Sequence, residues 1–406
     1  MIVKNSISVL MAALLLTYFM NASARASVDK SPVDINESKK MPGRRLFYNE
    51  GVNKKDQGPQ LECEGVLMWD HDHFTGAHID HTYEHYVRGN ETELRRASLT
   101  FKSKIDKNWK AELEISLSDV DEAPEAGDVF IEFTGWDWAE VIIGQTKEPF
   151  GLEEQTSSQY ITAIERSMAT NAFAPGSHPG IALSGDTKQL TWAIGIYEGA
   201  DREEERDTYA LTGRLTFTPW EHKKRVLHVG VSGSFRNLDG EDYEIKENAE
   251  VHTAEKVVVS DEIPADTLTL AAFEAAWVSG PLCFQAEYMG ASVKALEVED
   301  ATYSGYYVQG SYCLTGESRP YKKGGFKEIK PDKRFGALEM MCRYSVLDAK
   351  DNGMGDAAMN LTLGANYYSN THVRIMVNYI YTALTGDIPE NEKKAQAISY
   401  RLQYSF

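Results

Sequence analysis

The end of the chain, residues 398–406, alternates strictly between apolar and polar side chains. Apolar or aromatic residues occupy every second position and polar residues lie between them: Ile398, Tyr400, Leu402, Tyr404 and Phe406 against Ser399, Arg401, Gln403 and Ser405. Because a β-strand points successive side chains to opposite faces, this segment has one apolar and one polar face. A strand of this kind that ends in an aromatic residue is typical of the last strand of an outer-membrane barrel, where lipid covers the apolar face and water the polar one.

The beginning of the chain has the pattern of an export signal. Lys4 precedes an apolar stretch from Ile7 to Met20, and small residues follow at Ala22-Ser23-Ala24 and Ala24-Arg25-Ala26. The apolar stretch is shorter than the roughly 18 to 20 residues that a membrane-spanning helix needs. We therefore expect residues 1–26 to be a signal peptide. Residues 27–60, which are polar and contain several prolines, are expected to form a periplasmic N-terminal segment.

Composition excludes one class of partner. The formal net charge of the chain is −19, which argues against nucleic acid as a ligand. The 21 tyrosines fit a barrel whose amphipathic rings lie at the two membrane interfaces. The sequence predicts no cofactor.

The same alternation recurs along the chain and predicts an all-β fold. In residues 109–117, Trp109, Leu113 and their apolar neighbours alternate with Glu112, Glu114 and other polar residues. A soluble sandwich would cover such apolar faces with a second sheet, whereas a transmembrane barrel turns them toward lipid. We expect an antiparallel β-barrel over residues 61–406 with about sixteen strands, near 62–74, 93–105, 109–119, 128–134, 139–145, 180–186, 189–197, 208–219, 226–236, 267–279, 282–290, 302–314, 335–347, 357–368, 373–384 and 395–406.

The connections between these strands alternate between tight turns and long loops. Short turns and long external loops are a signature of outer-membrane barrels. With both termini in the periplasm the long loops all lie outside, except residues 315–334, a long connection where a short periplasmic turn is expected. Loop 146–179 carries several apolar residues, so we expect it to fold against the inner wall and narrow the pore.

Four segments resemble the family of phosphate-selective porins of the O and P type. They are Gly144–Glu154 with Thr156-Ser157-Ser158, Tyr160-Ile161-Thr162 and Glu165-Arg166-Ser167; Tyr307-Val308-Gln309 with Leu314–Tyr321; Arg343-Tyr344-Ser345 with Leu347-Asp348; and Leu94–Ala97. The resemblance implies a sixteen-stranded homotrimeric channel in the bacterial outer membrane, surrounded by lipid. Its expected function is passive diffusion of small hydrophilic solutes or ions, with phosphate and other anions as candidates.

The resemblance also implies candidate pore residues and one departure from the family. The family's phosphate channels carry a ladder of arginines that leads to lysines at the constriction. Here the matching strand end, Phe235-Arg236-Asn237-Leu238-Asp239, keeps one arginine and continues into acidic residues. The candidate anion contacts are Arg95, Arg96, Lys147, Arg166 and Arg236. The candidate acidic residues of the constriction are Glu112, Glu114, Glu153 and Glu154, so we expect a mixed lining with weak ion selectivity.

Other functions remain open at this point. A structural or adhesive barrel would share the fold, and some barrels are hydrolases with a site at the rim, although no Gly-x-Ser-x-Gly motif occurs. His78, His81 and His85 are weak candidates for a metal site, because His81 and His85 would share a helix face at i,i+4 spacing.

One disulfide is a further candidate. Cys283 and Cys313 lie on neighbouring predicted strands, and the midpoint between them falls inside the connecting loop. The antiparallel register that places them opposite one another predicts a bond across the strand pair.

Overall fold

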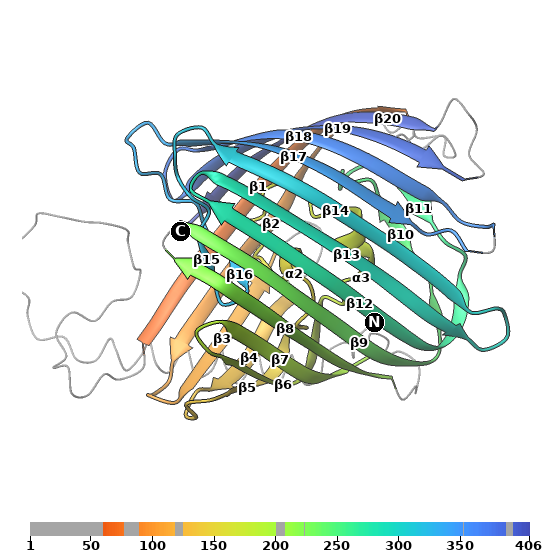
Figure 1. Cartoon of the computed structure of the whole chain (residues 1–406), viewed down its shortest axis with the longest axis horizontal. Coiled ribbons are helices and arrows are strands. Elements are labelled where there is room, and N and C mark those ends of the chain that lie inside the picture. Colours follow the sequence, from red (N-terminus) through yellow and green to blue (C-terminus); the bar gives the residue numbers. More distant parts are fainter. Residues whose placement is uncertain are drawn as a thin grey trace, which may run out of the picture.

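The computed structural model describes residues 60–76, 89–117, 125–199, 208–222, 224–351, 353–386 and 393–406. Sixteen strands of these residues form a closed antiparallel barrel, in which the first strand pairs with the last (Figure 1). The barrel strands are β1 (Gln60–Gly76), β2 (Asn90–Lys104), β3 (Trp109–Ser116), β4 (Glu125–Phe133), β5 (Glu140–Lys147), β6 (Ser177–Asp186), β7 (Leu190–Glu198), β8 (Tyr209–His222), β9 (Arg225–Tyr243), β12 (Ile263–Ser279), β13 (Leu282–Ala295), β14 (Ala301–Cys313), β17 (Ala337–Asp348), β18 (Ala357–Tyr368), β19 (Val373–Thr385) and β20 (Lys394–Ser405).

Two hairpins and two short helices complete the structure. The hairpins are β10 (Lys246–Asn248) with β11 (Lys256–Val259) and β15 (Tyr321–Lys322) with β16 (Gly325–Phe326); the helices are α2 (Leu152–Gln155) and α3 (Met168–Phe173). Within the described part of the chain, no helix has the length and apolar character needed to cross a membrane.

The barrel confirms the predicted fold class, and each predicted strand overlaps an observed one. The main difference is length, because β9 and β12 continue beyond the predicted 226–236 and 267–279. These additions pair with each other from Tyr243↔Ile263 to Glu241↔Ala265. The extended strands carry mixed polar sequence, so alternation alone did not reveal them.

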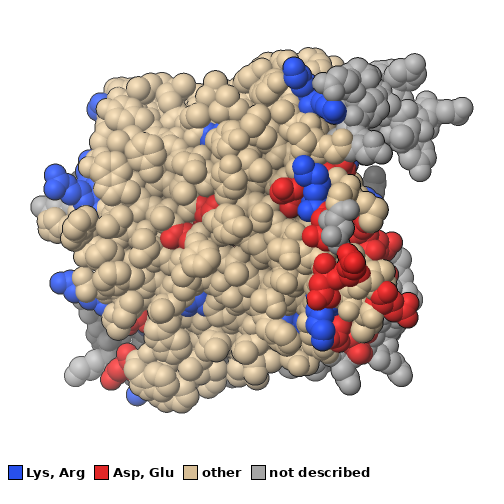
Figure 2. All heavy atoms as spheres, turned by 45° about the vertical axis from the view of Figure 1, so that its right-hand side comes forward, with Lys and Arg blue, Asp and Glu red and all other residues tan. Residues whose placement is uncertain are grey.

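The barrel is apolar outside and polar inside. On β20, Tyr400, Leu402 and Tyr404 are 44–47% exposed, whereas Arg401 and Gln403 are 3% and 5% exposed. Apart from β3 and β4, the other barrel strands follow the same rule, with large exposed side chains such as Ile194, Leu215, Phe273 and Leu361 outside. Figure 2 shows a broad uncharged wall with most charged side chains gathered at its two ends. A protein with this distribution has lipid where a soluble protein has water.

The outer face of the short strands β3 and β4 differs from the rest of the wall. Leu113, predicted to face lipid, lies on the outer face beside Phe101, its register partner on β2. It is only 2% exposed, because it packs in an outer apolar cluster with Ala111, Val129 and their neighbours.

With the exception of residues 314–336, which join β14 to β17, the long connections lie at one end of the barrel and the short turns at the other, which we call the loop end and the turn end. At the turn end, Gly280 takes a φ of 59° in the tight connection between β12 and β13. The Asp106 carboxylate accepts hydrogen bonds from the backbone N–H groups of Asn108 and Trp109 at 2.7 and 3.0 Å. Such turn residues satisfy backbone groups that the strands leave unpaired.

Candidate functional site

The lumen is the candidate site, because three connections pack against its inner wall. The largest is residues 148–176, the crossing segment, which joins β5 to β6 and contains α2 and α3 inside the barrel outline (Figure 1). Ser167 caps α3 by accepting a hydrogen bond from the Thr170 N–H. Helix α3 then buries Met168, Ala169 and Phe173 in the largest apolar cluster, which includes inward residues of β12, β13 and β14.

Four arginines bind the crossing segment through its backbone carbonyls. Arg343 on β17 donates to Glu165 O at 2.9 Å, and Arg374 on β19 donates to Gln159 O and Thr162 O at 3.3 Å. Arg401 on β20 donates to Ile164 O and Arg319 to Tyr160 O. These arginines, which we call the wall arginines although Arg319 lies in the connection between β14 and β15, are Arg319, Arg343, Arg374 and Arg401, and they are at most 4% exposed. These guanidinium groups therefore hold the crossing segment against the wall and are not exposed to the open lumen.

At the start of α2, a carboxylate of the wall accepts hydrogen bonds from backbone N–H groups of the crossing segment. Glu287 on β13 accepts hydrogen bonds from the backbone N–H groups of Leu152 and Glu153, both at 2.7 Å. Carboxylates are favoured there because the first N–H groups of a helix have no partners within it. The wall thus offers donors to the carbonyls of the crossing segment and an acceptor to its N–H groups.

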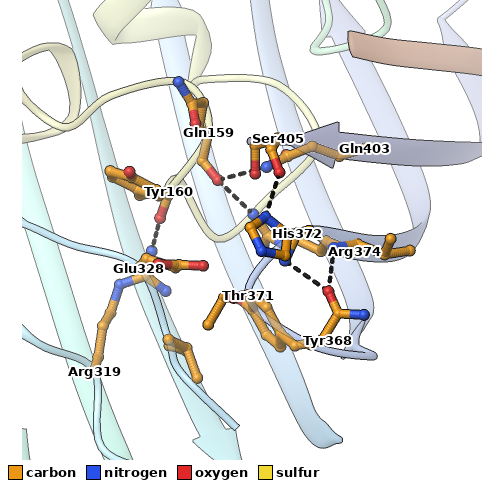
Figure 3. Close-up of a pocket in the computed structure, with 13 residues that line it drawn as sticks. Gln159, Tyr160, Arg319, Glu328, Tyr368, Thr371, His372, Arg374, Gln403 and Ser405 are labelled. Atoms are coloured by element: carbon orange, nitrogen blue, oxygen red, sulfur yellow. Dashed lines mark hydrogen bonds between the residues drawn. The ribbon is translucent and has the colours of Figure 1, made fainter. Parts of the chain in front are cut away.

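The tip of the crossing segment docks near the turn end, beside a small polar cavity. Figure 3 shows Gln159 and Tyr160 of the segment facing Arg374 and Gln403 of the wall and Arg319 of the connection that follows β14. Gln403 Nε2 donates to Gln159 O at 3.2 Å, the same carbonyl that Arg374 binds.

A second inserted element explains the long connection at residues 315–334. Its hairpin, β15–β16, enters the lumen from the turn end, with Phe326 packed against Leu152 of α2 in one buried cluster. Arg214 donates to Gly324 O at 2.7 Å, and the Tyr321 hydroxyl lies 2.6 Å from His228 Nδ1. The connection is long because its hairpin folds into the lumen and occupies part of it.

The third inserted element is the loop-end connection 244–262. Glu250 is 2% exposed and accepts from Arg343 Nη2 at 2.6 Å. Asn360 of β18 donates to Ala249 O at 2.9 Å. Arg343 therefore joins this connection, the crossing segment and the wall.

Most of the predicted anion contacts are paired with carboxylates. Arg95 binds both oxygens of Glu165 at 3.0 Å. Arg236 binds both oxygens of the buried Glu148 at 2.9 and 3.0 Å. Although burial alone would raise it, the guanidinium groups of Arg95 and Arg401 hold the pKa of Glu165 well below its usual range. These carboxylates therefore remain charged and neutralise their arginines.

Lys147 and Arg166 share a single carboxylate. Lys147 Nζ lies 2.8 Å from Glu154 Oε1, and Arg166 Nε lies 3.0 Å from Glu154 Oε2. Arg96 differs from the other candidates: within the described residues it makes no hydrogen bond and no ion pair. It lies near both Arg95 and Arg166 and is partly exposed to the lumen.

The predicted acidic residues fall into two groups. Glu112 and Glu114 lie on the lumen face of β3, opposite Lys102 and Thr100 of β2. Glu154 lies among the cations just described. Glu153 is 1% exposed and binds Arg343, Ser167 N and the Thr170 hydroxyl, so it holds the crossing segment together and does not line the open lumen.

The predicted disulfide is wrong. All four cysteines are free, and the partner of Cys283 across the strand pair is Ser311. Cys283 and Cys313 do share the lumen face, but the register is displaced by two residues from the predicted one. The connecting loop expected at residues 291–301 is shorter in the structure, because β13 continues to Ala295 and β14 begins at Ala301.

The remaining predicted sites fall outside this picture. His78, His81 and His85, the expected signal 1–26 and most of segment 27–60 lie outside the described residues. Among residues that are described, no group of three or more His, Cys, Asp or Glu is arranged to hold a metal ion.

Sequence reasoning missed the wall arginines as a group, although alternation placed Arg401 on the polar face. It also missed Glu287 and Glu250. The sequence signal for these residues is a charged side chain on the polar face of a strand. This signal indicates that the side chain points into the lumen, but it does not identify the residue that the side chain contacts.

A closed sixteen-stranded barrel with a lipid-facing exterior and a constricted polar lumen defines the class: an outer-membrane channel for passive diffusion. The model of the family "Phosphate-selective porin O and P" matches residues 73–406, and the chain belongs to this family.

Relatives and solved structures agree with this assignment. The chain is 27% identical to Porin O of Pseudomonas aeruginosa over 405 residues, covering 87% of this chain and 90% of the relative. The anion-selective porin from Comamonas acidovorans aligns with a TM-score of 0.57 and 10% identity, covering 86% of this chain and all of that one. The trimer form of OmpT from Vibrio cholerae aligns with a TM-score of 0.56 and 10% identity, with coverage of 86% and 100%. At these identities the two structures show the fold alone.

Proposed function

We propose that this channel passes small anions and cations with weak preference, phosphate among the anions, and that Arg96 is its principal anion contact. Porin O, the relative described above, belongs with the phosphate-selective porins by family. The single observation that carries the proposal is the pairing of the cations. Arg95, Lys147, Arg166 and Arg236 each contact a carboxylate, and Arg96 does not.

The lining supports weak preference. Glu112 and Glu114 bring negative charge to the lumen face of β3, while Lys102 faces them from β2. Lys102 is itself 2.6 Å from Glu64. Charged groups that line a pore set its selectivity, and here both signs occur at the same level.

We also propose a homotrimer in which the outer cluster around Leu113 lies at the subunit interface. The observation that supports it is the short wall on this side of the barrel, whose outer face carries the apolar cluster of Ala111, Leu113 and Val129. The strands there, β3 and β5, have eight residues each, against 19 in β9. A part of the barrel wall that is built from short strands is suited to contact between protomers. The OmpT structure described above is a trimer form.

The test is block of chloride current by phosphate in planar lipid bilayers. We expect stepwise conductance, with phosphate reducing chloride current only at millimolar levels, and Arg96→Gln weakening that reduction further. Arg225→Gln, an exposed arginine at the turn end, is the matched control and should behave as the unmodified channel. Equal block in the two variants would remove Arg96 from the proposal, and an absence of conductance steps would favour a structural barrel.

A further inference from the structure

Glu154 occupies an unusual position inside the lumen. It is 9% exposed, and each of its two carboxylate oxygens contacts a different cation: Oε1 faces Lys147 and Oε2 faces Arg166. Lys147 Nζ also donates to the Glu154 carbonyl at 3.0 Å. Two cations thus converge on one carboxylate from different elements, the end of β5 and the loop before α3.

A third cation acts on the same carboxylate. Burial alone would raise the pKa of Glu154, yet Arg166, Lys147 and Arg96 together hold it below its ordinary value. Arg96 forms no ion pair within the described residues, and it also interacts electrostatically with Glu114 and Glu165. Asp128 and Glu114 are the acidic groups nearby, since Asp128 interacts electrostatically with Lys147, Glu114 and Glu154.

The cluster is open to the lumen from the side of its cations. The side chains of Lys147 and Arg166 are 29% and 14% exposed, and the side chain of Glu154 between them is 11% exposed. A solute anion in the lumen can therefore reach the cations. However, the hydrogen-bond donors of Lys147 and Arg166 that point toward Glu154 are already occupied by its carboxylate.

A carboxylate held by two or three cations makes the contacts that a phosphate or carboxylate solute would make. Both ligands accept charge-assisted hydrogen bonds from ammonium and guanidinium groups. Glu154 is tethered to the protein, so it competes at a high effective concentration and a mobile anion must displace it.

We propose that Glu154 is a built-in anion, which fills a site formed by Lys147 and Arg166, beside Arg96, for phosphate-like or carboxylate solutes and thereby keeps the channel weakly selective. The inference rests on the proposed function and deepens it, because it names the residue that sets the selectivity. Glu154 is in this view the specificity-determining residue of the constriction.

The test is Glu154→Gln, which keeps the size of the side chain and removes its charge. Freed charge-assisted contacts should lower the half-blocking concentration of inorganic phosphate by about tenfold or more. The reversal potential in a potassium chloride gradient should also move toward that of chloride.

Glu114→Gln is the matched comparison, because it removes the same charge from the lumen at a residue outside the cation pair. It should shift the reversal potential in the same direction without strengthening phosphate block. Equal gains in block for the two variants would reduce Glu154 to a general electrostatic effect and overturn the inference.

A second variant of Glu154 and phosphate block of the unmodified channel also test the inference and the proposed function. If Glu154→Gln does not assemble, Glu154→Asp retains the charge but reaches only one of the two cations, and should strengthen block by a smaller factor; unchanged block would overturn the inference. Block of the unmodified channel at micromolar phosphate would instead contradict the proposed function, whatever the variants do.

Discussion

Arg343 connects three parts of the lumen, and its removal should loosen the constriction without destroying the barrel. It is 1% exposed and contacts Glu250 Oε2 at 2.6 Å, Glu153 Oε1 at 3.3 Å and Glu165 O at 2.9 Å. Arg343→Leu leaves two buried carboxylates without their cation.

The magnitude follows from the cost of breaking a buried ion pair. Removing one partner of such a pair typically costs about 3 to 5 kcal/mol, because the remaining charge stays buried. That weakens docking of the crossing segment and of connection 244–262 by roughly two to three and a half orders of magnitude. The strand pairing of β17 with β14 and β18 uses backbone groups and is unaffected.

Single-channel recording measures this effect. We expect Arg343→Leu to give larger and noisier open-channel currents, and Arg225→Gln to leave them unchanged. The double change Arg343→Leu with Glu250→Gln removes one of the stranded charges and should restore part of the quiet, smaller current. Unmodified conductance and noise in Arg343→Leu, in a barrel that inserts normally, would refute the role of this arginine.

Three further predictions follow from other parts of the structure. Ile194→Arg, on the outer face, should cost roughly 2 to 4 kcal/mol and lower the yield of folded barrel in refolding assays, whereas Thr100→Arg on the lumen face should not; equal yields would contradict the assignment of faces. Mass spectrometry of unreduced peptides should find Cys283 and Cys313 both alkylated, and a linked peptide pair would contradict the observed register. Burial raises the pKa of Glu247 to about 7, with Lys256 opposing; the folded hairpin β10–β11 then holds a proton that the unfolded chain releases above about 4.5, so its stability should fall as the pH rises from about 4.5 to 7. Hydrogen exchange, corrected for intrinsic rates, should show stronger protection of residues 244–262 at pH 5 than at pH 8, and Glu247→Gln should show no difference.

Alternation in the sequence was sufficient to predict the barrel. The period of two identifies a strand and its two faces together, so Leu402 and Arg401 were assigned to opposite sides correctly. The lengths of the connections then predicted which ends meet. Both signals are local, and a barrel of neighbouring antiparallel strands is built almost entirely from local pairings.

The pairing of charges inside the lumen could not be predicted in the same way. Arg401 meets Asp70 and Glu165 across more than 230 residues of sequence. Arg343 meets Glu250 through a loop whose fold the alternation does not describe. The disulfide prediction was wrong for a related reason, because the strand register depends on where β13 and β14 end and alternation does not mark those ends.

The reversal potential of the unmodified channel in a tenfold potassium chloride gradient tests the central claim most directly. Perfect selectivity for one ion would give about 59 mV for a monovalent ion. Because the lumen cations are largely paired with carboxylates and both signs line the pore, we predict a value much nearer zero. A potential close to that of chloride, with chloride current blocked by micromolar phosphate, would contradict the account.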